Sequence, residues 1–164
     1  MLYPYEFTHT GKRKEKQFVR HQFSFKTKYN RTYIVYADEF DSEMFIVKFF
    51  LKNHRHSKNR FRLMANDFDA KRVLDTCISI AGHILNLSPR ASFGFLGEPR
   101  IGEPRYRTKR FLVYLLYAAR HYNPIDWEHY TDENISGYFL LNTQNTTLNI
   151  QYVQEVFKDY IEVD

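Results

Sequence analysis

The sequence predicts an α+β domain, in which an antiparallel β-meander is followed by the order α-β-α-β and by a C-terminal helix. Two observations predict this class. Residues 17–64 contain three runs rich in aromatic and β-branched residues, a composition that favours strands. Three later segments instead carry apolar residues three and four positions apart, the spacing of an amphipathic helix. The chain has 164 residues, 43% of them apolar, and we expect a single domain over residues 17–164.

The first predicted elements are three strands that pair in sequence order. Their residues are QFVRHQFSFKT, RTYIVYAD and EMFIVKFFLKN. The segments between them, KYNR and EFDSE, have the composition of turns, so consecutive strands are expected to run antiparallel. RFRLM, after the basic loop NHRHSKN, is expected to add a short strand. Residues 1–16 are polar and basic without periodicity, which indicates a flexible basic arm before the domain.

Helices and strands alternate after the meander. Residues 69–87 form the first predicted helix, with Asn66, Asp67 or Asp69 as its N-cap. ASFGFLG predicts a short strand, and the Pro- and Gly-bearing segment EPRIGEPRYR predicts a loop. Thr108 is expected to cap the second helix, TKRFLVYLLYAARHY, which is apolar around most of its circumference and is therefore central. The long connection NPIDWEHYTDENIS leads to the strand GYFLL and to a terminal helix that closes one side of the sheet or serves a dimer.

The strand ASFGFLG is similar to the aromatic signature of RNA-recognition motifs. In such a motif the aromatic strand pairs in a hairpin with another strand, whereas here a predicted helix leads directly into it. Ala91-Ser92 also stands where the motif has Lys/Arg-Gly. A strand that is entered from one helix and left toward another is covered on both faces. We therefore expect Phe93 and Phe95 to be core residues rather than a surface on which bases stack.

The charge of the chain is strongly asymmetric. Residues 1–120 carry 23 Lys/Arg and 11 Asp/Glu, a net charge of +12, whereas residues 121–164 carry 1 and 8, a net charge of −7. A basic body attracts anionic partners through long-range electrostatics and counterion release. The alternative is that the two parts neutralise each other within the fold or across a homodimer.

Many of the basic residues lie in two loops, each of which precedes a predicted helix. We expect loops 52–62 and 100–110 to lie near each other at one end of the sheet, where the helix dipoles add to the charge. Four aromatic residues lie among these charges as candidates for stacking on bases, namely Tyr29, Tyr33, Phe61 and Tyr106. The candidate nucleic-acid-binding residues are Lys52, Arg55, Lys58, Arg60, Arg62, Arg100, Arg105, Arg107 and Lys109.

These observations predict a non-catalytic binding module for a polyanion, RNA or DNA, that requires no cofactor. An adaptor whose acidic C-terminal part docks on a basic protein partner is an alternative of another class. No apolar run reaches the roughly 18 residues of a membrane span, and the polar start lacks the apolar core of a signal peptide. We therefore expect a cytoplasmic protein without a membrane partner. The residues leave open whether the protein is an enzyme.

A second alternative comes from the segment Leu116-Tyr117-Ala118-Ala119-Arg120-His121-Tyr122, followed by Tyr130 and the strand 138–141. With the predicted element order, it resembles the later part of a GNAT-family N-acetyltransferase domain, over residues 20–142. The resemblance implies an acyltransferase that uses acetyl-CoA, with Tyr117 as the general acid that protonates the leaving thiolate. In that family a Gln/Arg-x-x-Gly-x-Gly/Ala turn holds the cofactor pyrophosphate. Here the corresponding junction has no glycine and contains Asp67 and Asp69.

Three further groups of residues have simpler interpretations than a reactive site. Cys77, the single cysteine, falls on the apolar stripe of the first helix and is expected in the core. His54 and His56 stand at alternate positions but among basic neighbours, which indicates a solvated loop rather than a zinc site. Asp67 and Asp69 are explained by helix capping rather than by magnesium binding. No metal site is expected.

Overall fold

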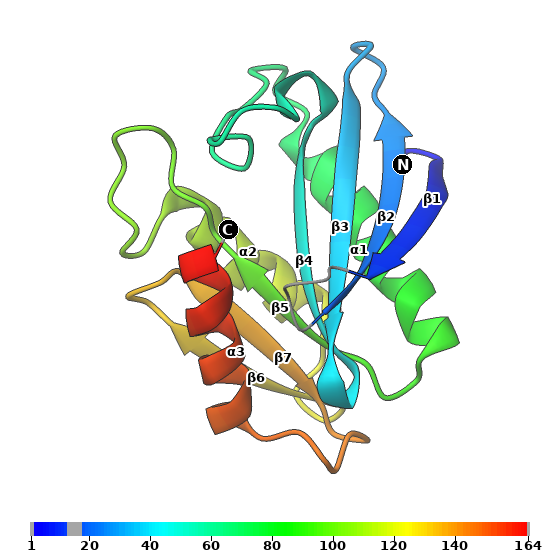
Figure 1. The fold of residues 1–164 in the computed structure, drawn as a ribbon, viewed down its shortest axis with the longest axis vertical. Coiled ribbons are helices and arrows are strands. Elements are labelled where there is room, and N and C mark those ends of the chain that lie inside the picture. Colours follow the sequence, from blue (N-terminus) through cyan, green and yellow to red (C-terminus); the bar gives the residue numbers. More distant parts are fainter. Residues whose placement is uncertain (1, 13–17, 164) are drawn as a thin grey trace.

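The computed structural model describes residues 2–12 and 18–163, which form one mixed sheet and three α-helices. The strands lie in the order β1-β2-β3-β4-β5-β7-β6 (Figure 1). The strands are β1 (Tyr5–Lys12), β2 (Val19–Lys26), β3 (Thr32–Phe40), β4 (Met44–Leu51), β5 (Ser92–Leu96), β6 (Trp127–Asp132) and β7 (Gly137–Asn142). The helices are α1 (Ala70–Leu87), α2 (Lys109–His121) and α3 (Ile150–Val163). This architecture confirms the predicted α+β class.

One pair of strands sets the shape of the sheet. All neighbouring strands run antiparallel except β4 and β5, which are parallel. Their ladder begins at Met44 and Ser92 and ends at Val47 and Phe95. Because β4 continues to Leu51 without β5 beside it, the two strands separate toward their carboxyl ends (Figure 1).

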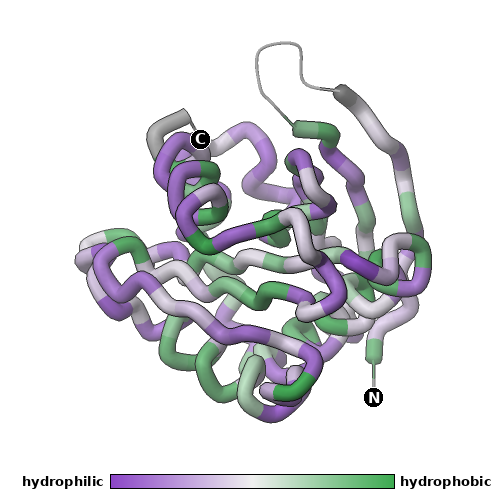
Figure 2. The backbone as a smooth tube through the Cα atoms, turned by 90° about the horizontal axis from the view of Figure 1, so that it is seen from below, coloured by the Kyte–Doolittle hydropathy of each residue, from purple (hydrophilic) through white to green (hydrophobic). Residues whose placement is uncertain are grey.

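The helices cover both faces of the sheet. Helices α1 and α2 lie on one face and α3 lies on the other, so the domain has three layers (Figures 1 and 2). Alternate residues of each strand point to opposite faces. In β4, Phe45 therefore belongs to the apolar cluster beneath α1 and α2, whereas Met44 and Ile46 belong to the cluster beneath α3.

Strand β5 is covered on both faces, as its position between helices predicts. Phe93 is fully buried and Phe95 is half-buried against the ring of Tyr114. This confirms that both are core residues. On the α3 face, a Cβ atom on Gly94 would overlap the ring of Phe157, so only glycine allows α3 to approach the sheet this closely.

Two strands were not predicted from the sequence. Residues 5–12, expected in the flexible arm, form β1, and the rings of Phe7 and Phe23 lie 5.4 Å apart across its ladder with β2. The Tyr3 backbone N–H also donates to Thr76 Oγ1 in α1, which ties this part of the chain to the domain. The rest of the expected arm, residues 13–16, lies outside the described residues.

The second unpredicted strand, β6, lies inside the segment expected as a long connection. Its first residue, Trp127, is buried against Phe93 and Tyr122, and the strand pairs with β7 at the sheet edge. Conversely, RFRLM does not form a strand. It lies in the loop that connects β4 to α1, where the backbone forms turns and irregular structure.

Of the two helix N-caps predicted from the sequence, one is formed by the predicted side chain. Thr108 Oγ1 accepts a hydrogen bond from the Phe111 backbone N–H at 3.1 Å, which confirms the predicted cap of α2. Asp69 occupies the N-cap position of α1, but its side chain makes no capping bond and accepts from the Tyr3 hydroxyl at 2.5 Å. None of the described helices is both long and apolar enough to cross a membrane.

A buried ionic cluster lies between the sheet and α3. The Arg20 guanidinium donates to both oxygens of the Asp38 carboxylate, at 2.7 and 2.9 Å, and the Tyr160 hydroxyl donates to the same carboxylate at 2.5 Å. Lys48 Nζ lies 4.2 Å from the ring centroid of Phe61 and 4.3 Å from that of Tyr160. The cluster joins β2, β3, β4 and the last turns of α3.

Candidate nucleic-acid interface

The two basic loops meet at one end of the molecule. Since β4 and β5 are parallel, the loops that follow them leave the sheet at the same edge. Arg62 donates to the backbone carbonyls of Pro99 at 3.0 Å and of Arg100 at 3.1 Å. Arg110 donates in the opposite direction, to the carbonyls of Phe61 and Leu63. These bonds confirm the predicted proximity of loops 52–62 and 100–110.

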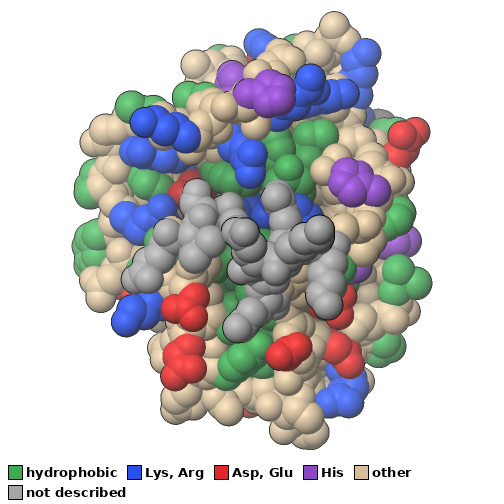
Figure 3. All heavy atoms as spheres, viewed as in Figure 1, with side chains coloured by type: hydrophobic (Ala, Val, Ile, Leu, Met, Phe, Trp, Pro, Cys, Tyr) green, Lys and Arg blue, Asp and Glu red, His purple; other side chains and the backbone are tan. Residues whose placement is uncertain are grey.

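The same end contains the turn between β2 and β3. We call the turn 27–31 together with the loops 52–69 and 97–108 the basic end (Figure 1, top and upper left). Helices α1 and α2 also begin there, so their positive dipole ends lie among the basic loops. In Figure 3, Lys and Arg side chains gather over the upper half of the visible face, and Asp and Glu lie mainly below them.

Four of the nine predicted binding residues are bound within the protein and hold the loops in place. Arg105 pairs with Glu98 at 2.9 Å, and Arg107 pairs with Glu133. Arg62 is held by the two carbonyls of the neighbouring loop. Arg60 donates to the Arg55 carbonyl at 3.2 Å, and its guanidinium lies 4.9 Å from the centroid of the Phe61 ring. These side chains shape the interface more than they offer charge to a ligand.

The other five predicted residues present exposed side chains at the basic end. They are Lys52, Arg55, Lys58, Arg100 and Lys109. The backbone N–H groups of Lys109 and Arg100 both donate to the Glu103 carboxylate, at 3.0 and 2.9 Å. These two bonds lower the pKa of Glu103 and fix the backbone from which the two cationic side chains extend.

Exposed aromatic rings accompany these charges. Of the four predicted stacking residues, Tyr29 is 46% exposed and Tyr106 is 55% exposed, whereas Tyr33 and Phe61 are half-buried against other aromatic rings. The Tyr106 hydroxyl donates to Glu133 at 3.3 Å, which orients the ring. Phe68, which sequence analysis did not single out, is fully exposed and has a φ of 54°, a conformation that non-glycine residues rarely adopt.

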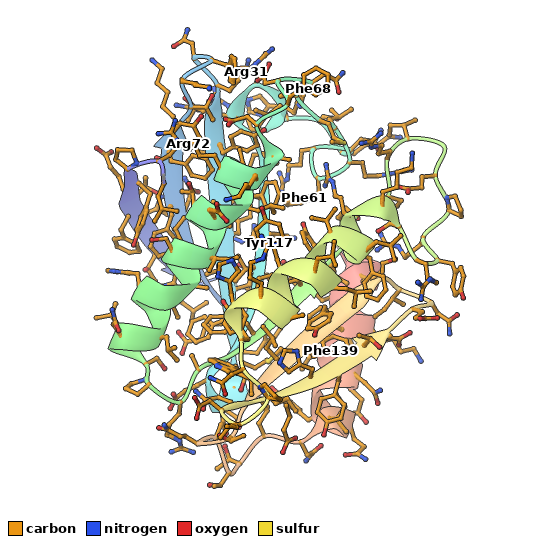
Figure 4. All side chains as sticks on the ribbon, turned by 180° about the vertical axis from the view of Figure 1, so that it is seen from behind. Arg31, Phe61, Phe68, Arg72, Tyr117 and Phe139 are labelled. Carbon is orange, nitrogen blue, oxygen red and sulfur yellow. The ribbon has the colours of Figure 1, made fainter. Side chains whose placement is uncertain are left out.

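A cleft of about 390 Å³ lies behind Phe68, between the beginnings of α1 and α2. Its floor is apolar and aromatic and comes from β3, β4 and both helices. The main floor residues are Tyr33, Phe49, Val73, Leu74 and Tyr114. Figure 4, seen from the side of α1 and α2, shows Phe68 beside the start of α1.

The two walls of this cleft carry opposite charges. Arg100, Lys109 and Arg110 line it on the side of α2. Asp67 and Asp69 line it on the side of α1, where Asp67 accepts from Arg31 Nε at 3.1 Å. The sequence predicted that these carboxylates cap α1, but their side chains accept from Arg31 and Tyr3 and make no capping bond.

Tyr117, the candidate general acid, lies elsewhere. Its hydroxyl donates to the Lys71 carbonyl at 3.4 Å, and its ring stacks on His121 between α1 and α2 (Figure 4). It lines a smaller apolar cavity of about 40 Å³ together with Cys77. Burial raises the pKa of Tyr117, and burial raises the pKa of the Cys77 thiol to about 12, as expected for a core cysteine.

Within residues 2–12 and 18–163, no three His, Cys, Asp or Glu side chains are grouped so that they could hold a metal ion.

No protein-family model, no curated protein and no solved structure matches this chain. The basic end offers three kinds of groups to a ligand: exposed cations, exposed aromatic rings, and a cleft with an apolar floor and walls of opposite charge.

Proposed function

We propose that the protein binds single-stranded nucleic acid at its basic end, without catalysing a reaction. The convergence of loops 52–62 and 100–110 with the turn 27–31 is the observation that carries this proposal. Exposed cations bind phosphates and release counterions. Exposed rings such as Tyr29, Phe68 and Tyr106 stack on bases only when those bases are unpaired, which favours a single strand.

The distribution of charge over the surface supports binding of a polyanion at the basic end. In Figure 3 the visible Asp and Glu side chains lie mainly below the Lys and Arg side chains, although Glu133 lies at the basic end, where it pairs with Arg107. A polyanion that approaches the molecule is therefore attracted to the basic end and repelled from the opposite end.

The proposal is tested by titrating fluorescent single-stranded RNA and DNA at several salt concentrations. The variant replaces three exposed cations of the basic end by glutamine, at Arg55, Lys58 and Arg100. A matched control removes the same charge from exposed positions elsewhere, at Arg90, Arg120 and Lys158. Each phosphate contact contributes about 0.7 to the slope of log K against log salt for a single strand. The first variant should lower the magnitude of that slope by about 2, and the control should leave it nearly unchanged.

Two results would overturn the proposal. The wild-type protein would show no binding near physiological salt, or both variants would weaken binding equally, which would indicate a general effect of net charge. Arg60, Arg62, Arg105 and Arg107 are kept intact in this design, because their removal would disturb the loops themselves.

The second candidate function is acyl transfer of the GNAT type, with acetyl-CoA as cofactor and Tyr117 as general acid. It is favoured by the parallel strands β4 and β5, which separate beside a cleft of about 390 Å³. Two features weigh against it. The Tyr117 hydroxyl is bound to the Lys71 carbonyl on the smaller cavity, and residues 52–69 contain no glycine but place Asp67 and Asp69 at the start of α1.

The second candidate has its own test. A cofactor that binds the folded state raises the unfolding temperature with increasing ligand concentration. Acetyl-CoA at millimolar concentration should therefore shift the melting temperature if this function is correct. A shift that is equal for acetyl-CoA and for inorganic pyrophosphate would instead indicate binding of phosphate alone.

A further inference from the structure

The geometry points to the cleft at the basic end as the site for one nucleotide of the bound strand, whose base carries an exocyclic amino group. The base would enter the cleft and the phosphate would face α2. This inference rests on the proposed function, because it assigns one part of the strand to one part of the same surface.

The size and the floor of the cleft fit a planar ring. Its volume of about 390 Å³ falls in the range of small-molecule sites, roughly 300–1,000 Å³. The rings of Tyr33, Phe49 and Tyr114 and the side chains of Val73 and Leu74 form a floor against which a base packs without losing hydrogen bonds. The exposed residues Met64, Phe68 and Val113 also line the cleft, so it opens to solvent.

The cationic wall defines where the phosphate lies. Arg100 and Lys109 are exposed, and the hydrogen bonds from their backbone to Glu103 hold them at the mouth of the cleft. Arg110 is half-buried and is fixed by its bonds to the carbonyls of Phe61 and Leu63. A phosphate at this wall meets three positive charges that are already in place, as charge-assisted binding requires.

The opposite wall defines which bases are accepted. Ionised carboxylates only accept hydrogen bonds, and each has about four lone-pair positions. Asp67 accepts from Arg31 and Asp69 accepts from Tyr3, which leaves acceptor capacity on both. An amino group, as on cytosine N4 or adenine N6, donates to such an acceptor, whereas the O4 carbonyl of uracil is repelled. The walls therefore select an amine-bearing base with its phosphate on the side of α2.

Oligomers of deoxycytidine and deoxyuridine, each twelve nucleotides long, test this selection. They have the same phosphates, sugars and ring size, and differ at the group that would face the carboxylates. Binding is measured at neutral pH by fluorescence anisotropy. The wild-type protein should bind the cytidine oligomer about ten-fold more tightly.

Two substitutions at adjacent positions of α2 provide a matched pair. Val113 is 38% exposed and lines the cleft, whereas Leu112 is 39% exposed and does not line it. Val113→Trp should fill the cleft and bring the ratio of the two affinities close to one. Leu112→Trp should leave the ratio unchanged. Asp67→Asn, which keeps the shape of the side chain but adds a donor, should also reduce the ratio.

The outcomes separate this inference from the proposed function. Equal affinity of the wild-type protein for the two oligomers overturns the cleft assignment and leaves binding at the basic end intact. A preference for cytidine that survives in both Val113→Trp and Asp67→Asn also overturns it. Absence of binding to either oligomer overturns the proposed function, and the inference with it.

Discussion

Replacing Lys48 by methionine is expected to stabilise the fold at neutral pH. Lys48 is 7% exposed and lies between the sheet and α3, against the rings of Phe61 and Tyr160. Burial lowers the pKa of its amine from the ordinary 10.5 to about 6. Because the pKa is lower in the folded state, the unfolded chain binds more protons between pH 6 and 10.5. Lowering the pH through this interval therefore destabilises the wild-type protein.

The expected magnitude follows from these two pKa values. Methionine has nearly the volume of lysine and does not titrate, so the variant lacks this pH-dependent penalty. A change of two pH units inside this interval changes the free energy of unfolding of the wild-type protein by about 3 kcal/mol. The advantage of the variant in the free energy of unfolding should therefore be larger at pH 7 than at pH 9 by about 3 kcal/mol.

Urea unfolding at pH 7 and pH 9 measures this difference. Lys52→Met is the control, because Lys52 is exposed at the end of the same strand and its substitution should give no pH-dependent gain. An advantage of Lys48→Met that is equal at the two pH values would refute the reasoning, since it would show that Lys48 is charged in the folded state.

Three further predictions concern local geometry, and urea unfolding measures their effect on stability. Gly94→Ala should destabilise by about 1–3 kcal/mol, because the added methyl group overlaps Phe157, whereas Gly82→Ala, in open space on α1, should be neutral or stabilising. Thr108→Ala should cost about 1 kcal/mol through loss of the α2 cap, and Thr108→Ser should restore most of it. Phe68→Gly should stabilise by about 1 kcal/mol, because φ is 54° there, and should weaken binding of single-stranded nucleic acid.

The elements that were predicted correctly have strong local patterns. The helical spacing in residues 69–87 and the cap at Thr108 depend only on nearby residues, so the sequence is sufficient to predict them. Strand β1 was missed because residues 1–16 are mostly polar and basic, and its pairing with β2 at the sheet edge depends on more distant residues. Strand β6 was missed because most of its residues are polar, although its pairing with β7 is local.

The proximity of the two basic loops was predicted from the sequence, but the partners of their side chains were not. Each of the two basic loops follows a strand and precedes a helix. When those two strands are parallel, both loops lie at the same end of the sheet, and that end is electropositive. Which arginines are available could not be predicted, because the partners of Arg105 and Arg107 are carboxylates 7 and 26 residues away. The exposure of Phe68 depends on a backbone conformation that no local sequence signal indicated.

The short parallel ladder between Met44–Val47 and Ser92–Phe95 is the only stretch of backbone pairing that joins the two halves of the described sheet. One half contains β1 to β4, and the other half contains β5, β7 and β6. Helix α3 contacts both halves of the sheet, since Phe157 packs on Phe139 of β7 and the Tyr160 hydroxyl donates to Asp38 of β3. A chain without α3 would lose these contacts, and the two halves would then be free to unfold at different denaturant concentrations.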